Sequence, residues 1–401
     1  MINQVASLQT EFVQRRKTWL PYGRQWIDEA DIQAVVAVLQ SEYLTTGPQI
    51  EHFERKLALR VGASYAVAFS NGTAALHAAC YAAGIGPGDE VITTPITFAA
   101  SANCVLYQQG IPVFADIDEQ TYNIDPNQVA ALITPRTKAI IPVDYSGQPA
   151  DLHELRAIAK EHGLVVIEDA AHALGAAYDG QPIGSISDMT MFSLHPVKQI
   201  TSGEGGVITT NSLAYYEKLL EFRSHGIVRD PVRWSQESAP VGWYYEMQSL
   251  GYNYRLTDMQ AALASSQLDK LDRFVELRSE YAAYYDEAFS QFSLIKTPFQ
   301  KESRQSSWHL YVIQLELEFL STDRNQIYNE LIAENIGVQV HYIPVYLHPY
   351  YQQLGYAKGQ CLKAEKLFER MLTLPLFPSM THEDVQDVID AVFRVIGKYA
   401  C

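Results

Sequence analysis

The sequence contains few cysteines, and they are widely spaced. Only four occur in 401 residues, at positions 80, 104, 361 and 401, and no two of them form a C-x-x-C pair. Zinc sites and disulfide frameworks usually rest on closely spaced cysteines, so the sequence predicts neither a disulfide nor a metal site. Cys80 and Cys104 lie in apolar helical surroundings and are expected in the core. Such cysteine usage is typical of a reducing compartment, and we expect a cytoplasmic protein.

Basic residues and long apolar runs are also scarce. Lys and Arg number 30 against 46 Asp and Glu, which gives a formal net charge of −16. Because phosphate backbones and anionic lipids attract basic surfaces, this balance argues against nucleic-acid and membrane partners. No apolar stretch is long enough to cross a bilayer, and the first residues lack the basic and apolar regions of a signal peptide.

Short apolar runs alternate with helical segments between residues 65 and 210. This alternation predicts an α/β fold with a mostly parallel central sheet and helices on both faces. Polar residues and two prolines make the stretch 225–242 an expected loop, after a helix over 215–224. Strands are predicted at 65–69, 90–94, 113–115, 139–143, 164–167, 189–194 and 206–209, and helices at 73–83, 99–108 and 151–162.

The pattern changes after residue 289. Long helices over 256–289 are followed by predicted strands at 310–315 and 338–343 and helices at 323–334 and 381–399, which indicates a smaller α+β domain. A chain of this length exceeds the usual size of one hydrophobic core, so two domains are expected. We predict an N-terminal segment 1–30 near the active site, a large cofactor-binding domain 31–260 and a small C-terminal domain 261–401.

Three residues in a fixed order indicate pyridoxal 5′-phosphate (PLP). Asp169 closes an apolar strand, where ligands bind in open α/β sheets, and its carboxylate would keep the pyridine nitrogen protonated. Ser193 offers a hydroxyl, and five residues later Lys198 precedes the glycine-rich turn 203–206. Lys198 would form the Schiff base and then carry a proton at the substrate carbon. Taken singly, such a lysine is usually a solvated loop residue and such an aspartate a helix cap, but the three together favour the cofactor.

Two turns from strand to helix add weaker signals. The turn at 70–76 leaves backbone N–H groups free at a helix N-terminus, where Gly72 and Thr73 suit a phosphate. Phe98 follows the next strand and would stack on the cofactor ring, although an aromatic residue there is more often part of the core. His172, three residues after Asp169, would reach the same ring, and a packed histidine is the alternative.

Together these motifs resemble the DegT/DnrJ/EryC1/StrS family, sugar-nucleotide aminotransferases of PLP fold type I, the aspartate-aminotransferase fold. The motifs lie at residues 70–76, 168–175, 193–198, 203–206 and 251–256. The resemblance implies that Lys198 is the Schiff-base lysine, that Asp169 is the pyridine-nitrogen acid and that His172 contacts the ring hydroxyl. It implies a homodimer with shared active sites, because Asn253 matches a residue that reaches the phosphate from the neighbouring subunit. The other matching cofactor positions are Thr73, Ala74, Phe98 and Ser193.

Four further stretches resemble the branch of this family that aminates C4 of a UDP-linked 4-keto-6-deoxy-N-acetylhexosamine on the way to pseudaminic acid. They are residues 93–98, 172–175, 223–226 and 340–344. L-glutamate is the implied donor, and pyridoxamine 5′-phosphate the form that carries the nitrogen between the two substrates. The positions that match substrate contacts are Tyr22, Glu42, Tyr43, Leu44, Thr45, Val340, His341, Tyr342 and Ile343. Positive charge makes Arg223, His225 and Arg229 candidates for the diphosphate, with a solvated loop as the alternative for each.

Other functions stay open at this stage. The same chemistry would serve a dTDP- or GDP-linked keto sugar, with amination at C3 or C4. A PLP-type sugar dehydratase is disfavoured, because members of that branch carry histidine where Lys198 stands. A non-enzymatic PLP-binding regulator is disfavoured too, because no DNA-binding helix or basic extension is visible.

Overall fold

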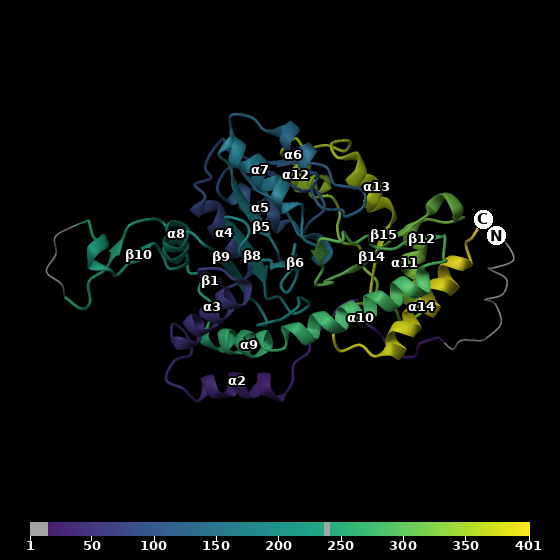
Figure 1. Cartoon of the computed structure of the whole chain (residues 1–401), viewed down its shortest axis with the longest axis horizontal. Helices are drawn as coiled ribbons and strands as arrows, with labels where there is room; N and C mark the ends of the chain where they lie inside the picture. The colour runs from purple at the N-terminus through teal and green to yellow at the C-terminus, as the bar shows by residue number, and fades with distance from the viewer. Residues whose placement is uncertain (1–14, 236–240) are drawn as a thin grey trace.

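The computed structural model describes residues 15–235 and 241–401 (Figure 1). Its centre is a seven-stranded sheet with the order β1-β9-β8-β5-β4-β2-β3. Only β9 runs antiparallel to its neighbours β1 and β8, so the predicted mostly parallel α/β sheet is confirmed. The strands are β1 (Tyr65–Phe69), β2 (Glu90–Thr93), β3 (Ile111–Phe114), β4 (Thr137–Ile141), β5 (Val165–Asp169), β8 (Met189–Ser193) and β9 (Gly206–Thr210).

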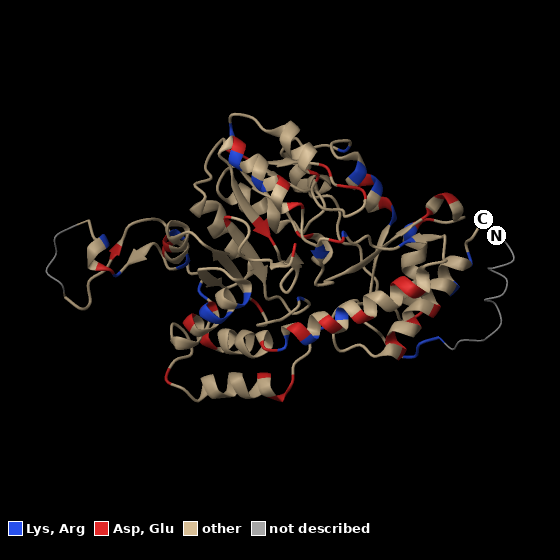
Figure 2. Ribbon diagram, viewed as in Figure 1, with Lys and Arg blue, Asp and Glu red and all other residues tan. Residues whose placement is uncertain are grey.

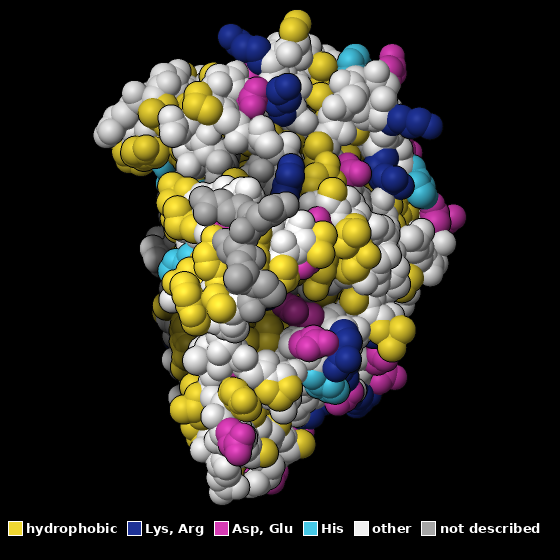
Figure 3. Space-filling view, turned by 90° about the vertical axis from the view of Figure 1, so that its left-hand side faces the viewer, with side chains coloured by type: hydrophobic (Ala, Val, Ile, Leu, Met, Phe, Trp, Pro, Cys, Tyr) yellow, Lys and Arg dark blue, Asp and Glu magenta, His cyan; other side chains and the backbone are white. Residues whose placement is uncertain are grey.

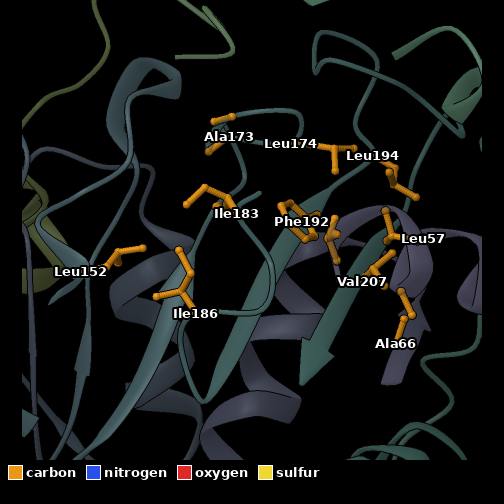
Figure 4. Close-up of a cluster of buried hydrophobic side chains, with 14 of the residues drawn as sticks. Leu57, Ala66, Leu152, Ala173, Leu174, Ile183, Ile186, Phe192, Leu194 and Val207 are labelled. Carbon is orange, nitrogen blue, oxygen red and sulfur yellow. The ribbon is translucent and has the colours of Figure 1, made fainter. Parts of the chain in front are cut away.

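Helices cover both faces of this sheet because successive strand residues point to opposite sides. Phe192 of β8 and Val207 of β9 pack with Leu57 in one buried cluster (Figure 4), whereas Met191 and Ile208 pack in another. The helices of this part are α2 (Glu29–Leu39), α3 (Pro48–Val61), α4 (Gly72–Ala82), α5 (Ala100–Tyr107), α6 (Pro126–Leu132), α7 (Leu152–His162), α8 (Leu213–Arg223) and α9 (Asp258–Leu268).

The long helix α10 (Leu271–Phe289) joins the sheet to the C-terminal part (Figure 1). Its first turns pack in the same cluster as Leu57, and its later turns pack in a separate cluster with the C-terminal elements. Charged residues of both signs are interspersed along α10 (Figure 2). The C-terminal elements are β12 (Ile295–Lys296), β14 (Tyr311–Leu315), β15 (Met371–Leu374), α11 (Arg324–Ala333), α12 (Pro349–Gln353), α13 (Leu362–Arg370) and α14 (His382–Gly397).

The domain boundary at residues 260/261 stays a prediction, as does the role of residues 1–30, of which the first fourteen lie outside the described residues.

Short elements complete the fold. β13 (Arg304–Gln305) pairs with β6 (Ala177–Tyr178), which pairs with β7 (Gln181–Pro182). β10 (Ile227–Val228) and β11 (Glu246–Met247) pair in an arm that projects from the body (Figure 1). Hydrophobic side chains gather on the face of the molecule from which this arm projects (Figure 3).

Two sequence predictions need correction. The strand predicted over 338–343 is wrong, because only Gln339 forms a bridge, to Thr373 of β15. The chain then leaves the sheet, and the carbonyl of His341 accepts a hydrogen bond from the Tyr145 hydroxyl instead of a strand partner. The expected loop 225–242 contains β10 and a short 3₁₀ helix (Pro231–Arg233), while residues 236–240 lie outside the described part of the chain.

Cys80, Cys104 and Cys361 are buried, Cys401 is exposed, and all four are free thiols. Within the two described ranges, no helix combines the length and the apolar character that a membrane span requires. No cluster of three or more His, Cys, Asp or Glu side chains in the same ranges is arranged to hold a metal ion.

Candidate active site

Lys198 lies on a turn just beyond β8. Its backbone N–H donates to the carbonyl of His195 at 2.9 Å, and its half-buried side chain places Nζ 3.4 Å from Nε2 of His309. Burial lowers the pKa of Lys198 to about 8, because a charged amine loses its water there, and the positive charge of Arg278 lowers it further. Asp169 acts in the opposite direction. At pH 7 a pKa of about 8 leaves roughly a tenth of the amine unprotonated, which makes it a usable nucleophile.

Asp169 ends the neighbouring strand β5 and is buried. The Ser101 hydroxyl donates to Oδ2 at 2.6 Å, and the Ala171 N–H donates to Oδ1 at 3.1 Å, so both carboxylate oxygens are fixed. Burial raises the pKa of Asp169, although these two hydrogen bonds and the nearby Lys198 each favour the ionised form. A cationic group placed against Asp169 would therefore offset the cost of burying its ionised carboxylate.

The N-terminus of α4 faces Ser193 at the end of β8. Asn71 caps this helix, its side-chain oxygen accepting from the Ala74 N–H at 2.8 Å. A Cβ atom added at Gly72 would lie 3.6 Å from the Ser193 hydroxyl oxygen, at ordinary van der Waals distance, so Ser193 directly faces the first residue of the helix. The free N–H groups of a first helical turn and a facing hydroxyl are suited to an anion such as phosphate.

His172 lies between Lys198 and the C-terminal part. Its Nδ1 accepts from the Ser146 N–H at 3.3 Å, which leaves Nε2 to donate to the Tyr342 hydroxyl at 3.1 Å. Burial and the nearby Lys198 lower the pKa of His172 well below its usual value, so the ring is neutral. A neutral ring in a fixed tautomer orients whatever hydroxyl or ring oxygen lies beside it.

Several predicted substrate residues assemble around the same point. The rings of Tyr22 and His341 lie 5.2 Å apart between centroids, and those of Phe98 and Tyr342 lie 6.3 Å apart. His341 is further held by Thr373, whose hydroxyl oxygen lies 2.9 Å from its Nδ1. Phe98 is 63% exposed, which leaves its face free for a flat ligand. Val340 is half-buried and Ile343 is exposed on the same segment.

Among the described residues, no hydrogen bond or ring contact joins the other predicted residues to Lys198, Asp169 or His172. Glu42, Tyr43, Leu44 and Thr45 are exposed before α3, where Thr45 pairs with Thr257. Asn253 is exposed and pairs through its backbone with Ser224. Arg229 lies in the projecting arm, with its guanidinium 5.2 Å from the centre of the Tyr245 ring. Their roles stay predictions, and the predicted role of Asn253 depends on a second subunit.

Arg223, a candidate for binding the diphosphate, instead contacts Glu54 and Ala68 of its own chain. Its guanidinium contacts Glu54 Oε1 at 2.5 Å and donates to the Ala68 carbonyl at 3.0 Å. This pair satisfies a largely buried acid, so Arg223 has a structural role in this chain.

Sequence reasoning missed two buried residues at the site. The ring of His309 lies 4.3 Å from that of His172, and its Nδ1 has no hydrogen-bond partner among the residues that the structure describes. Ser101 holds Asp169 from the first turn of α5. His309 directly precedes the predicted strand 310–315, but no periodicity marks it as a site residue, and Ser101 is one of several small residues in its helix.

The residues present fit PLP. A lysine amine with a depressed pKa, a buried acid with a raised one, and an anion-binding helix terminus that faces Ser193 are the donor set that this cofactor requires. The lysine and the acid follow the carboxyl ends of neighbouring parallel strands, so the fold and the site define a fold-type-I PLP enzyme.

Comparisons with known proteins agree. Residues 25–393 match the DegT/DnrJ/EryC1/StrS aminotransferase family, and the chain belongs to this family. It is 44% identical over 386 residues to the spore coat polysaccharide biosynthesis protein SpsC of Bacillus subtilis, covering 96% of this chain and 99% of SpsC.

Solved structures show the same fold. Helicobacter pylori PseC, an aminotransferase involved in pseudaminic acid biosynthesis, superposes with a TM-score of 0.88 at 33% identity, covering 96% of this chain and 100% of that one. The sugar aminotransferase Spr1654 of Streptococcus pneumoniae, solved in a PMP form, superposes with a TM-score of 0.88 at 33% identity, covering 94% of this chain and 99% of that one. A PLP form of Spr1654 has also been solved. The match over residues 25–393 confirms the predicted family. The chain is 44% identical to SpsC and 33% identical to PseC, so the branch within the family stays a prediction.

Proposed function

We propose that this chain is a PLP-dependent aminotransferase that moves the amino group of L-glutamate to C4 of a UDP-linked 4-keto-6-deoxy-N-acetylhexosamine. The observation that carries the proposal is the convergence of the Lys198 amine, the Asp169 carboxylate and the α4 terminus at the carboxyl ends of β5 and β8. Family membership makes it a sugar aminotransferase, and the sugar and the nucleotide are the finer part of the proposal.

Each residue has a definable task. Lys198 holds the cofactor and then moves a proton at the reacting carbon, which its depressed pKa permits near neutrality. Asp169 keeps the pyridine nitrogen protonated, and His172 orients the ring through its fixed tautomer. When bound, PLP supplies the electron sink for charge that develops at the substrate carbon. Thr73, Ala74 and Ser193 hold the phosphate, and Asn253 completes this site from the second subunit.

Aromatic residues from the two ends of the chain support the sugar site. Tyr22 lies in the N-terminal segment, and its backbone carbonyl accepts from the Leu376 N–H at 3.1 Å, so it is fixed beside His341. Such faces suit the apolar side of a 6-deoxy sugar, while the Tyr342 hydroxyl offers a polar contact.

A second substrate has its own support. The identity to SpsC exceeds that to PseC, and SpsC is a spore coat polysaccharide biosynthesis protein. Another keto-sugar nucleotide, such as a dTDP-linked 4-keto-6-deoxyhexose, is therefore the second candidate.

Borohydride reduction tests the lysine assignment. We expect the cofactor to become covalently attached to the peptide that contains Lys198, and Lys198→Ala to abolish transamination while circular dichroism and the melting temperature stay near the wild-type values. Lys366→Ala, which removes an exposed lysine of α13, is the matched control and should keep full activity. Attachment to a different lysine would contradict the assignment.

A panel of 4-keto sugar nucleotides tests the acceptor. We expect kcat/KM for the UDP-linked acetamido sugar to exceed that for a dTDP-linked 4-keto-6-deoxyglucose at least about tenfold, since a site that binds the acetamido group loses about 1–3 kcal/mol without it. Product configuration is read by NMR. The reverse preference would select the second candidate and leave the aminotransferase chemistry intact.

A further inference from the structure

Arg278 is a buried cation without an acidic partner. It lies in the middle of α10, only 1% of its surface is exposed, and burial lowers its pKa to about 9. The other Arg of α10, Arg273, is exposed and pairs with Glu276. Among the described residues Arg278 contacts no carboxylate, and carbonyl oxygens surround it instead.

These carbonyls belong to three separate segments. Nη1 donates to the carbonyls of Trp308 and His309 at 3.2 Å each and of Leu376 at 2.9 Å, and Nη2 lies 3.5 Å from the carbonyl of Val197. Val197 directly precedes Lys198. One guanidinium thus joins the turn that carries the lysine to the segment that carries His309, whose ring contacts the lysine amine.

Burial of an unpaired charge costs stability, which its hydrogen bonds offset only in part. A methionine of similar length would fill the same space without that cost. The presence of a cation at this position therefore points to a role other than packing.

We propose that Arg278 is a positioning residue for Lys198: it fixes the turn that carries the lysine against the His309 segment and keeps a positive charge near the lysine amine. The proposal rests on the role of Lys198 in the proposed function, and it explains how this lysine stays reactive before the cofactor binds. A nearby like charge disfavours the protonated amine, so Arg278 increases the unprotonated fraction.

The other groups that face Lys198 do not supply this effect. Asp169 from the end of β5 favours the protonated amine. His172, His309 and His341 carry pKa values lowered by burial and are neutral at pH 7. Tyr342 also stays neutral there, because burial raises its pKa. Arg278 is the remaining charged group among the described residues that act on this amine.

Competitive acetylation of the cofactor-free full-length protein tests the proposal without any transamination assay. Acetic anhydride is applied over a range of pH, and mass spectrometry of the Lys198 peptide gives the midpoint at which its amine becomes reactive, with the exposed Lys366 as internal reference. The wild-type midpoint should lie near the value of about 8. In Arg278→Met and Arg278→Gln the midpoint should rise, by less than the full difference from an exposed lysine, because burial is the larger cause of the depression.

Arg273→Gln, on the exposed side of the same helix, is the matched control and should leave the midpoint unchanged. A wild-type midpoint near the ordinary lysine value of about 10.4 overturns the proposal even if neither Arg278 variant folds. The proposal is also overturned if either Arg278 variant has a native near-ultraviolet circular dichroism spectrum and the same midpoint as the wild-type protein. Failure of transamination with a depressed midpoint would instead count against the proposed function and leave the role of Arg278 standing.

Discussion

Asp169 illustrates how one residue combines a stability cost with a function. Its carboxylate is buried, and burial raises the pKa of Asp169, so the ionised form carries an energetic cost in the folded protein without cofactor. A protonated pyridine nitrogen would supply the opposite charge that the carboxylate lacks. The residue is thus arranged for a partner rather than for the stability of the chain alone.

Replacement of Asp169 by Asn should therefore separate activity from stability. We expect kcat to fall by about 10²–10³-fold, because one electrostatic partner in an enclosed site is lost. The free energy of unfolding of the cofactor-free protein should stay within about 1 kcal/mol or increase, since a neutral amide avoids the cost of a buried charge. Steady-state kinetics and urea denaturation measure the two quantities. Asp323→Asn, where the new side chain can still cap α11, is the control, and near-normal turnover of Asp169→Asn would refute the role.

The sequence predicted the residues whose type and context carry chemistry. Lys198, Asp169 and Ser193 stand beside predicted strands and turns, so their neighbourhood could be inferred. His309, Ser101 and Arg278 could not, because they enter the site from elements whose approach depends on tertiary packing. Arg223 was assigned to a ligand because its charge was visible and its buried partner Glu54 was not.

At the scale of elements, the strands of the central sheet were predictable and their directions were not. Continuous apolar runs between turns mark buried strands, and the observed strands agree with them to within about two residues. These apolar runs do not indicate the direction of a strand, so the antiparallel direction of β9 could not be predicted from them. The stretch 338–343 resembled a strand because it is rich in apolar and aromatic residues, and of these Val338 and His341 are buried. The helices α2 and α3 were not assigned.

Close packing of β9 against α4 explains why residue 206 is glycine. A Cβ atom at Gly206 would lie 2.5 Å from the carbonyl oxygen of Asn71 and 2.7 Å from the Cα of Gly72. Asn71 caps α4, so any larger residue at 206 must displace the helix N-terminus that faces Ser193.

Gly206→Ala should consequently affect both stability and cofactor binding. We expect the free energy of unfolding to fall by about 1–3 kcal/mol from overpacking, and the affinity for PLP to fall as the first turn of α4 moves. Urea denaturation and fluorescence titration with PLP measure these changes. Gly397→Ala at the end of α14, where an added Cβ meets nothing within 4 Å, should be neutral or slightly stabilising. Unchanged PLP affinity in folded Gly206→Ala would contradict this account of the helix terminus.

At the scale of the whole molecule, several of the predicted site residues are exposed in a single chain. They are Asn253, Arg229 and the segment 42–45, and among the described residues no hydrogen bond or ring contact joins them to Lys198. Trp243 and Leu250, in and next to the projecting arm, are 74% and 75% exposed. Hydrophobic side chains also gather on the face shown in Figure 3. Exposed apolar groups of this kind are typical of interfaces, which favours the predicted homodimer.

Shared active sites make a specific prediction about mixed dimers. Lys198→Ala and Asn253→Ala should each be nearly inactive alone, because each dimer of one variant lacks the same residue in both sites. When the two variants are refolded together, mixed dimers should regain activity, since one of their two sites then has both residues intact. With equal amounts and random pairing, about half of the dimers are mixed and each has one working site, so about a quarter of the wild-type activity should return.

Affinity tags of two kinds isolate the mixed species, and each variant refolded with itself is the control. Isolated mixed dimers without activity would place Lys198 and Asn253 in the site of the same subunit.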